Sequence, residues 1–266
     1  MNRLRVGRIS ALNMYPLFHG LERAADPELA FTDGLPTTLN EMVLDGRLDI
    51  SAMSSIAYAR NAERLHLLPV ASVTAAGAVD SIQVFSRVPF ERVRTVAVTP
   101  HSATSVALLR VLLGPEAPAF TVLDGPAEAA LATHDGVLLI ADEALGALGR
   151  GIAPHHTDLA AVWHRRTGLP MVFAVWAARA QTATERPAAL RALADHLVRA
   201  REAYLAEPEA VVRAAAARFP FPEDFIRPYL ARLTYDFGAS EQAGLSEFLR
   251  QAAAAGELAS APVLAA

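Results

Sequence analysis

Hydrophobic runs alternate with polar turns along the first 180 or so residues, in the order expected of an open α/β fold. The pattern starts with an apolar strand at Leu4–Ile9, a polar segment at residues 10–13, and helical spacing from Pro16. Proline is tolerated in the first turn of a helix, where its missing N–H has no partner to lose. A strand that enters a helix through a polar turn is a typical ligand site of such sheets.

Three later strand ends repeat this arrangement. The strand at residues 48–53 leads into Ser54 and Ser55, the strand at 96–98 leads into the hydroxyl-rich turn 99–105, and the strand at 137–140 leads into an acidic segment. In the turn 99–105, hydroxyl groups stand where backbone N–H groups and the positive end of a helix converge. Such a turn suits a carboxylate or a phosphate.

The hydrophobic pattern of the rest of the chain predicts further strands and helices. Together with the elements above they form two α/β units followed by a helical region. Further strands are expected at 29–32, 67–73, 82–85, 120–123 and 171–177, and helices from Pro36 and over 187–205, 222–233 and 240–255. The strand at 171–177 is apolar on both faces, which indicates a central, covered position. We predict an α/β fold with two lobes and a ligand cleft between them, lobe one being residues 1–87 and 177–266 and lobe two residues 88–176.

Structural roles compete with functional ones at these positions. Ser10 and Asn13 could cap the first helix, and Asp142 could cap the helix that follows residue 140. Ser55 or Ser102 as a nucleophile would need a histidine base, and no G-x-S-x-G turn surrounds either one. Hydrogen-bond donation is the preferred role for these hydroxyls.

Composition narrows the class of ligand. The 266 residues are 53% hydrophobic, contain no cysteine and carry a formal net charge of −4. Disulfides and thiolate sites are excluded, and the scattered basic residues do not form a nucleic-acid footprint. No window reaches the ~18 apolar residues of a membrane span, and the first residues lack the apolar core of a signal peptide. We therefore expect a cytoplasmic protein with a small ligand, no nucleic-acid partner and no membrane insertion.

Metal and nucleotide signatures are missing from the sequence. The eight histidines show neither H-x-x-x-H nor H-E-x-x-H spacing, and His155 and His156 are interpreted as loop residues. Neither G-x-G-x-x-G nor G-x-x-x-x-G-K-[ST] occurs. We expect no metal and no cofactor, and Trp163 and Trp176 are expected in the core. The residues thus describe a binding protein or a cofactor-free enzyme for a small anion, and do not separate the two.

Several segments, taken in this order, resemble the chorismate dehydratases of the futalosine route to menaquinone. They are VGRISALN at 6–13 with Pro16 and Leu17, PTTLN at 36–40, GRLDI at 46–50, SSIAYA at 54–59, SATSV at 102–106, ADEAL at 141–145, TGLP at 167–170 and FAVW at 173–176. The chain departs from that family at Ala11, where an aromatic residue is frequent, at Met14, where Thr or Cys is frequent, and at Ala141, where Gly is common.

The resemblance implies the fold of type II periplasmic binding proteins and the loss of water from chorismate, a dicarboxylate, to give 3-[(1-carboxyvinyl)oxy]benzoate. It implies that Asn13 is the catalytic position, in an orienting and polarising role, and that the proton acceptor is a substrate carboxylate or a water. The expected substrate-binding residues are Ser10, Pro36, Ser54, Ser55, Ser81, Ser102, Thr104, Ser105 and Asp142. Rival functions are a small-carboxylate binding protein without turnover and the related 1,4-dihydroxy-6-naphthoate synthase, against which the Ser-x-Leu-Asn segment at 10–13 argues.

Overall fold

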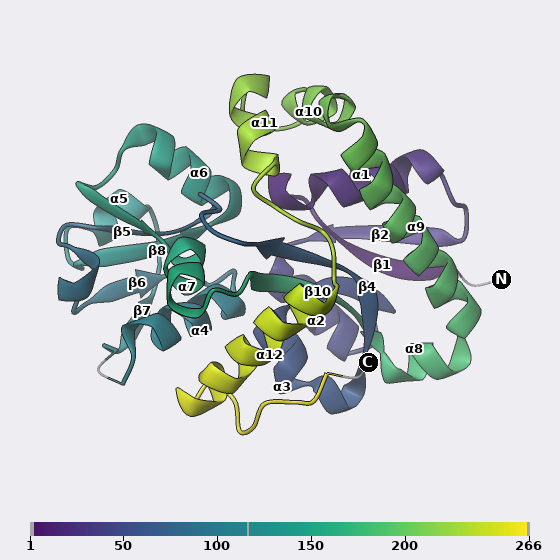
Figure 1. The fold of residues 1–266 in the computed structure, drawn as a ribbon, viewed down its shortest axis with the longest axis horizontal. Helices are drawn as coiled ribbons and strands as arrows, with labels where there is room; N and C mark the ends of the chain where they lie inside the picture. The colour runs from purple at the N-terminus through teal and green to yellow at the C-terminus, as the bar shows by residue number, and fades with distance from the viewer. Residues whose placement is uncertain (1–2, 116, 265–266) are drawn as a thin grey trace.

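Two five-stranded sheets lie side by side in the computed structural model, which describes residues 3–115 and 117–264 (Figure 1). The first sheet has the order β2-β1-β3-β10-β4 and the second the order β7-β6-β8-β5-β9. The strands of the first sheet are β1 Leu4–Ile9, β2 Leu29–Gly34, β3 Ile50–Ser54, β4 Leu65–Ala75 and β10 Met171–Arg179. Those of the second are β5 Ile82–Ser86, β6 Val96–Val98, β7 Phe120–Val122, β8 Gly136–Ile140 and β9 His155–Asp158.

Helices cover both sheets and join them along one side. The first sheet is accompanied by α1 Tyr15–Ala24, α2 Pro36–Leu44, α3 Ser55–Arg60, α8 Ala180–Glu185, α9 Pro187–Ala206, α10 Pro208–Ala216 and α11 Glu223–Leu230. The second is accompanied by α4 Ala103–Leu113, α5 Ala127–Ala130, α6 Ala141–Arg150 and α7 Leu159–Thr167. The last helix, α12 Ala239–Ala254, contacts α3, α4 and β10 and thus packs against both halves (Figure 1). No helix among the described residues is long and apolar enough to cross a membrane.

The strands of the two sheets are arranged in the same way. In each sheet the fourth strand, β10 or β5, comes from a chain segment that follows the other half of the molecule. In the first sheet β1 runs parallel to β2 and β3, and β10 is antiparallel to β3 and β4. In the second sheet β6 runs parallel to β7 and β8, and β5 is antiparallel to β8 and β9. The predicted α/β fold with two lobes has this construction.

Both crossovers lie earlier in the chain than the predicted boundaries at residues 87 and 177. β5 falls within the range predicted for lobe one, but its partners belong to the second sheet. The carboxylate of Asp158 explains why, since it accepts from the N–H of Val79 at 2.8 Å and of Asp80 at 2.7 Å and thereby fixes the start of β5. β10 pairs with β4 from Met171 onward, inside the range predicted for lobe two. The division into two lobes remains our proposal, with the crossovers at 76–81 and 168–170.

Most of the predicted elements occur, and the differences concern short or polar ones. Residues 155–156, interpreted as a loop, form the exposed edge strand β9. The short helix α8 and the helix α10 are present although no periodicity was assigned to them. Trp163 and Trp176 are fully buried, as predicted. The interior is continuous, because one hydrophobic cluster includes residues from both sheets, such as Ile50 and Val96.

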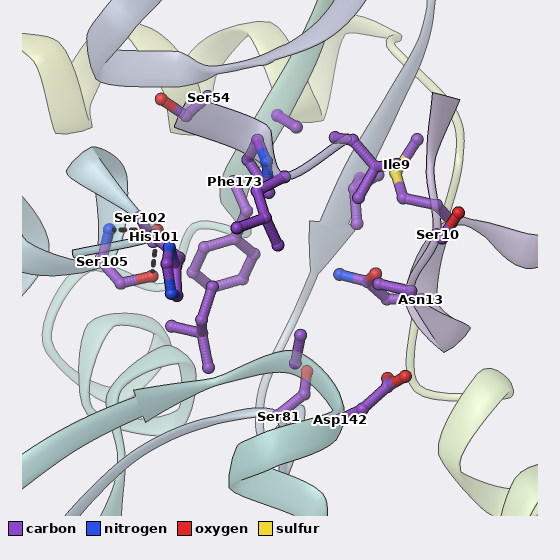
Figure 2. A pocket seen from close by; sticks show the side chains of 18 of the residues that line it. Ile9, Ser10, Asn13, Ser54, Ser81, His101, Ser102, Ser105, Asp142 and Phe173 are labelled. Atoms are coloured by element: carbon purple, nitrogen blue, oxygen red, sulfur yellow. Dashed lines mark hydrogen bonds between the residues drawn. The ribbon is translucent and has the colours of Figure 1, made fainter. Parts of the chain in front are cut away.

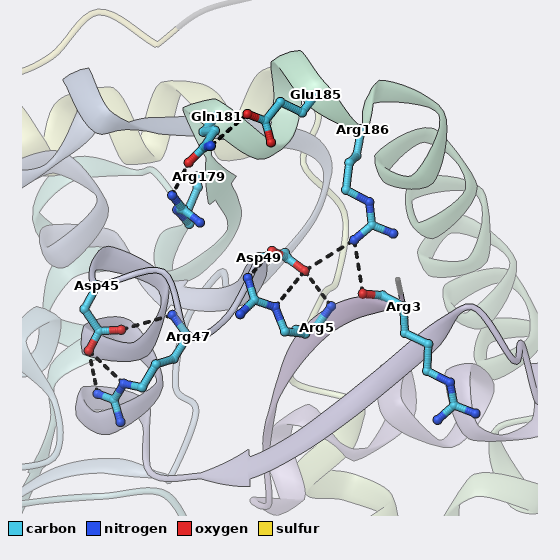
Figure 3. Close-up of polar contacts among 9 residues, drawn as sticks. All are labelled: Arg3, Arg5, Asp45, Arg47, Asp49, Arg179, Gln181, Glu185 and Arg186. Atoms are coloured by element: carbon cyan, nitrogen blue, oxygen red, sulfur yellow. Dashed lines mark hydrogen bonds and ion pairs between the residues drawn. The ribbon is translucent and has the colours of Figure 1, made fainter. Parts of the chain in front are cut away.

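A closed ion-pair cluster holds the amino-terminal end of β1 beside the start of β3 (Figure 3). Asp49 accepts from the backbone N–H of Arg5 at 2.8 Å and from its guanidinium at 2.6 and 3.2 Å, and Arg186 lies 3.5 Å away. Arg186 also donates to the carbonyl of Arg3 at 3.1 Å. Burial acts to raise the pKa of Asp49, but the hydrogen bonds and charge of Arg5 outweigh it and hold that pKa below its ordinary value.

Candidate functional site

A cavity of about 550 Å³ lies between the two sheets, at the carboxyl ends of β1, β3 and β8 (Figure 2). This volume is within the range of roughly 300–1,000 Å³ that is usual for small-ligand sites. The lining residues are Ile9, Ser10, Ala11, Asn13, Met14, Asp33, Gly34, Leu35, Pro36, Ser54, Val73, Ser81, Ile82, His101, Ser102, Ser105, Ile140, Ala141, Asp142, Glu143, Phe173 and Ala174. The strand ends that the sequence predicted to face a ligand therefore do meet in one place.

All but two of the predicted site residues line this cavity. The exceptions are Ser55 and Thr104, which are both buried and both engaged in structural contacts. Ser55 donates its hydroxyl to the carbonyl of Val172 at 2.7 Å, joining α3 to β10. The hydroxyl oxygen of Thr104 accepts from the N–H of Ile56 at 3.1 Å, joining the starts of α3 and α4. Their expected role as ligand donors is not supported by these positions.

Helix capping accounts for only one of the predicted polar side chains. Neither the short helix Leu12–Met14 nor α1 has a side-chain cap, so Asn13 and Ser10 do not cap them. Likewise α6 has no side-chain cap, and Asp142 lies within its first turn. Ser102 does cap α4, because its hydroxyl oxygen accepts from the N–H of Ser105 at 3.1 Å. The capping alternatives for Asn13, Ser10 and Asp142 are therefore wrong.

Asn13 presents a buried amide oxygen that has no partner among the described residues. Its Oδ1 is shielded from solvent and makes no hydrogen bond. The hydroxyl of Ser54 across the cavity is also shielded from solvent and unpaired. The backbone carbonyl of Asn13 is fixed, since the buried hydroxyl of Tyr235 donates to it at 2.8 Å. Buried polar groups are nearly always paired, so unpaired ones on a cavity wall indicate where a ligand would bind.

Asp142 lies opposite the serine-rich turn and connects the two halves of the molecule (Figure 2). Its Oδ1 accepts from the N–H of Leu12 at 3.1 Å. Burial raises the pKa of the Asp142 carboxyl, and this single N–H only partly offsets the effect. The residue before it, Ala141, has a left-handed backbone with φ +50°, and its N–H donates to the carbonyl of Ser81 at 2.7 Å. The start of α6 and the Ser81 segment thus form one continuous wall.

The electrostatic character of the cavity comes mainly from helix starts. Pro36 begins α2, Ser102 caps α4 and Ala141 begins α6, so three positive helix ends converge on it. Arg8 approaches from outside but is committed, since it pairs with Asp33 at 2.5 Å. Hydrogen bonds and charge from Arg8 lower the pKa of Asp33 against the opposing effect of its burial. The arrangement favours an anion held by neutral donors.

The sequence reasoning missed four lining residues whose side chains could contact a ligand. Asp33 and Glu143 add acidic groups, Phe173 adds an aromatic face, and His101 adds an imidazole. No histidine is among the residues predicted for the site. His101 lies inside the hydroxyl-rich turn 99–105, but its spacing to the other histidines gives no signal of a functional role. Among the described residues no group of three or more His, Cys, Asp or Glu side chains is placed to hold a metal ion.

The fold is that of two-lobed binding proteins. A Candida albicans protein described as having the generic periplasmic binding protein fold aligns over 98% of this chain and 92% of its own, with a TM-score of 0.71 and 11% identity. A protein of Archaeoglobus fulgidus gives a TM-score of 0.72 at 19% identity, over 96% of this chain and 98% of its own. At such identities the likeness defines the fold, as predicted, and leaves the function open.

Sequence comparison assigns the chain to a family. A family model described as menaquinone biosynthesis matches residues 4–254. A chorismate dehydratase of Thermus thermophilus is 33% identical over 253 residues, covering 89% of this chain and 90% of the relative. A chorismate dehydratase of Campylobacter jejuni is 30% identical over 174 residues, covering 63% and 64%. The chain belongs to the menaquinone-biosynthesis family, which confirms the resemblance seen in its segments.

Proposed function

We propose that this chain is a chorismate dehydratase, which converts chorismate to 3-[(1-carboxyvinyl)oxy]benzoate and water. The observation that carries the proposal is 33% identity to the Thermus thermophilus enzyme over nearly the whole chain, together with the family match over 4–254, which spans every cavity residue. The cavity supports it because positive helix ends and neutral donors suit a dicarboxylate. We further propose that it acts in the cytoplasm, in the futalosine route.

The reaction needs little from the protein beyond positioning. A ring proton and the ring hydroxyl leave as water, and the ring becomes aromatic, so the driving force lies in the substrate. Holding the carboxylates from two sides would orient the ring and exclude solvent, which is how positioning and closure lower a barrier. Ser54 offers an unpaired hydroxyl from the first half of the molecule and Ser105 offers one from the second, while the hydroxyls of Ser10 and Ser102 already donate to Asp33 and Ser105. We assign the two carboxylates to these two sides.

Asn13 is our candidate for the catalytic residue. Its amide belongs to a turn whose carbonyl is fixed by Tyr235, and its own oxygen has no partner. A neutral amide is a poor base, so its role is to orient and polarise the reacting part of the substrate. Ser81 and Asp142 lie on the same wall of the cavity, and we propose that they contact the substrate as well.

Binding without turnover is the rival function that the fold itself suggests. The periplasmic aliphatic sulphonate binding protein of Escherichia coli aligns over 93% of this chain and 90% of its own, with a TM-score of 0.66 and 17% identity. The same two-lobed fold can therefore serve an anion-binding protein. Only a measurement of turnover separates the two functions.

The deciding experiment incubates the purified chain with chorismate and follows both compounds by liquid chromatography and mass spectrometry. We expect chorismate to disappear and a product lighter by one water to appear, faster than in a parallel sample without protein. A second assay measures chorismate binding by calorimetry. Folded protein that binds chorismate and leaves it unchanged would identify a binding protein and overturn the dehydratase proposal.

A further inference from the structure

The cavity has to bind a dianion, and this inference rests on that proposed function. Among its lining residues, all of which the structure describes, none is an arginine, and the whole sequence contains no lysine. Three lining residues, Asp33, Asp142 and Glu143, are acidic. Helix ends offset part of this charge, but a substrate with two carboxylates still lacks a full positive charge to pair with.

The arginines beside the cavity are not available for that role. Arg8 donates to Asp33 at 2.5 and 2.8 Å, and a further short bond joins it to Glu22. Arg232, behind the Ser81 segment, is paired with Asp80. Recruiting either guanidinium would leave a carboxylate without its charged partner.

His101 is the remaining lining side chain that can become a cation. It is half-buried at the start of α4, and its backbone N–H donates to the hydroxyl of Thr99 at 3.2 Å. Its imidazole makes no hydrogen bond with the residues that the structure describes, and it lies beside Ser102 and Ser105 (Figure 2). A carboxylate bound beside an imidazole favours the imidazolium form of that ring.

The neighbouring hydroxyls are arranged to work with it. Ser102 donates its hydroxyl to the oxygen of Ser105 at 2.8 Å, so the Ser105 hydrogen remains free for a ligand. A carboxylate at this corner would meet an imidazolium, a hydroxyl and the positive end of α4 together. We propose that His101, as the imidazolium, is the residue that recognises one carboxylate of the substrate and thereby selects dicarboxylates.

The test removes one charge at a time, either a carboxylate charge from the ligand or the His101 side chain from the protein. The probes are 3-[(1-carboxyvinyl)oxy]benzoate and its two monoamides, in which one or the other carboxylate is replaced by a carboxamide. Binding to the unaltered chain, to His101→Gln and to His101→Arg is measured by calorimetry, with thermal midpoints to check the fold. His156→Gln, on the exposed strand β9, is the matched control.

We expect His101→Gln to weaken the dicarboxylate and one monoamide by about 10-fold or more, and to leave the other monoamide, which lacks the recognised carboxylate, nearly unchanged. His101→Arg should restore part of the affinity, and His156→Gln should bind as the unaltered chain does. In turnover, KM for chorismate should rise more than kcat falls. Equal weakening of all three probes, or no weakening, would overturn the inference even if chorismate is converted. If the unaltered chain neither converts chorismate nor binds the dicarboxylate, the proposed function fails and the inference with it.

Discussion

Two carboxylates at opposite ends of the first sheet, Asp49 buried and Asp142 half-buried, have opposite surroundings. Asp49, at the amino-terminal end, accepts three hydrogen bonds from Arg5, and its pKa is lowered. Asp142, which reaches the carboxyl-terminal end from the second sheet, has one N–H donor, and its pKa is raised. One end of the sheet is thus saturated with internal bonds, while the other keeps polar groups unpaired.

This contrast indicates where the molecule is optimised for folding and where for a ligand. Asn13 Oδ1 and the Ser54 hydroxyl, both at the cavity end, lack partners among the described residues. Leaving them so lowers the stability of the unbound protein, and a bound substrate would supply the missing bonds. Changes at the two ends should therefore separate stability from activity.

The largest effect is expected for Asn13→Asp. It replaces a donor by a negative charge beside a dianionic substrate, so turnover of chorismate should fall by about 100-fold or more. The thermal midpoint should change little, because the amide caps no helix. Asn61→Asp, remote from the cavity, is the control and should keep normal turnover. An Asn13→Asp variant with near-normal turnover would end the catalytic assignment.

Asp49→Asn should show the converse, lower stability with unchanged turnover. Removing the charge leaves Arg5 unpaired, and we expect the free energy of unfolding at pH 7 to fall by about 2 kcal/mol in denaturant titrations. Because the folded pKa of Asp49 is lowered, its contribution is present above the pKa of the unfolded chain and disappears as the pH falls through the folded pKa. The gap between variant and parent should therefore close in acid.

The control for this substitution is Asp45→Asn, which removes an exposed partner of Arg47 on the same side of the molecule (Figure 3). Exposed ion pairs contribute little, so the stability of that variant should match the parent. A loss at Asp45 as large as that at Asp49 would mean that net charge, and not the buried pair, is responsible.

Asp142→Asn should change the pH dependence of stability in the opposite direction to Asp49→Asn. A raised folded pKa stabilises the fold below the pKa of the unfolded chain, and this contribution is lost as the pH rises through the folded pKa. The amide oxygen can still accept from Leu12, so at pH 7 the variant should be more stable than the parent in denaturant titrations. The two proteins should converge in acid. A variant that is less stable than its parent at pH 7 would show that the carboxylate is stabilised there after all.

Sequence reasoning located the strand ends because apolar runs and helix starts are local signals. It could not distinguish Ser54 from Ser55, because the two residues are adjacent at the junction of β3 and α3 and their side chains point in different directions. The Ser54 side chain lines the cavity, and the Ser55 hydroxyl donates to the carbonyl of Val172. Sequence reasoning placed β5 in the wrong half for a related reason. The contacts that fix β5, from Asp158, come from a residue 78 and 79 positions further along the chain than the N–H groups it binds.

Charge balance across the cavity was equally invisible in the sequence. The proposed role of His101 as a cation depends on the fact that the arginines near the site are already paired, as Arg8 is with Asp33. The sequence does not show these pairings. The short helix α8 was missed because it buries only Thr182 and so leaves no apolar stripe. Local periodicity therefore predicted the strands and helices, whereas the charge of the cavity depends on ion pairs between residues that are distant in the sequence.

The smallest effect concerns Ala141, whose φ of +50° is strained for any residue with a Cβ. Ala141→Gly should relieve that strain at some cost in backbone entropy, for a net gain of about 0.5 kcal/mol in the free energy of unfolding. Ala25 has nearly the same conformation, φ +48°, at the end of α1, and Ala25→Gly should gain as much. Only Ala141 lies on the cavity wall and bonds to Ser81, so only Ala141→Gly should also change KM for chorismate. If Ala25→Gly gains stability and Ala141→Gly loses it, the left-handed turn before Asp142 is held by contacts that outweigh its strain, and the start of α6 would have to be treated as a rigid part of the site.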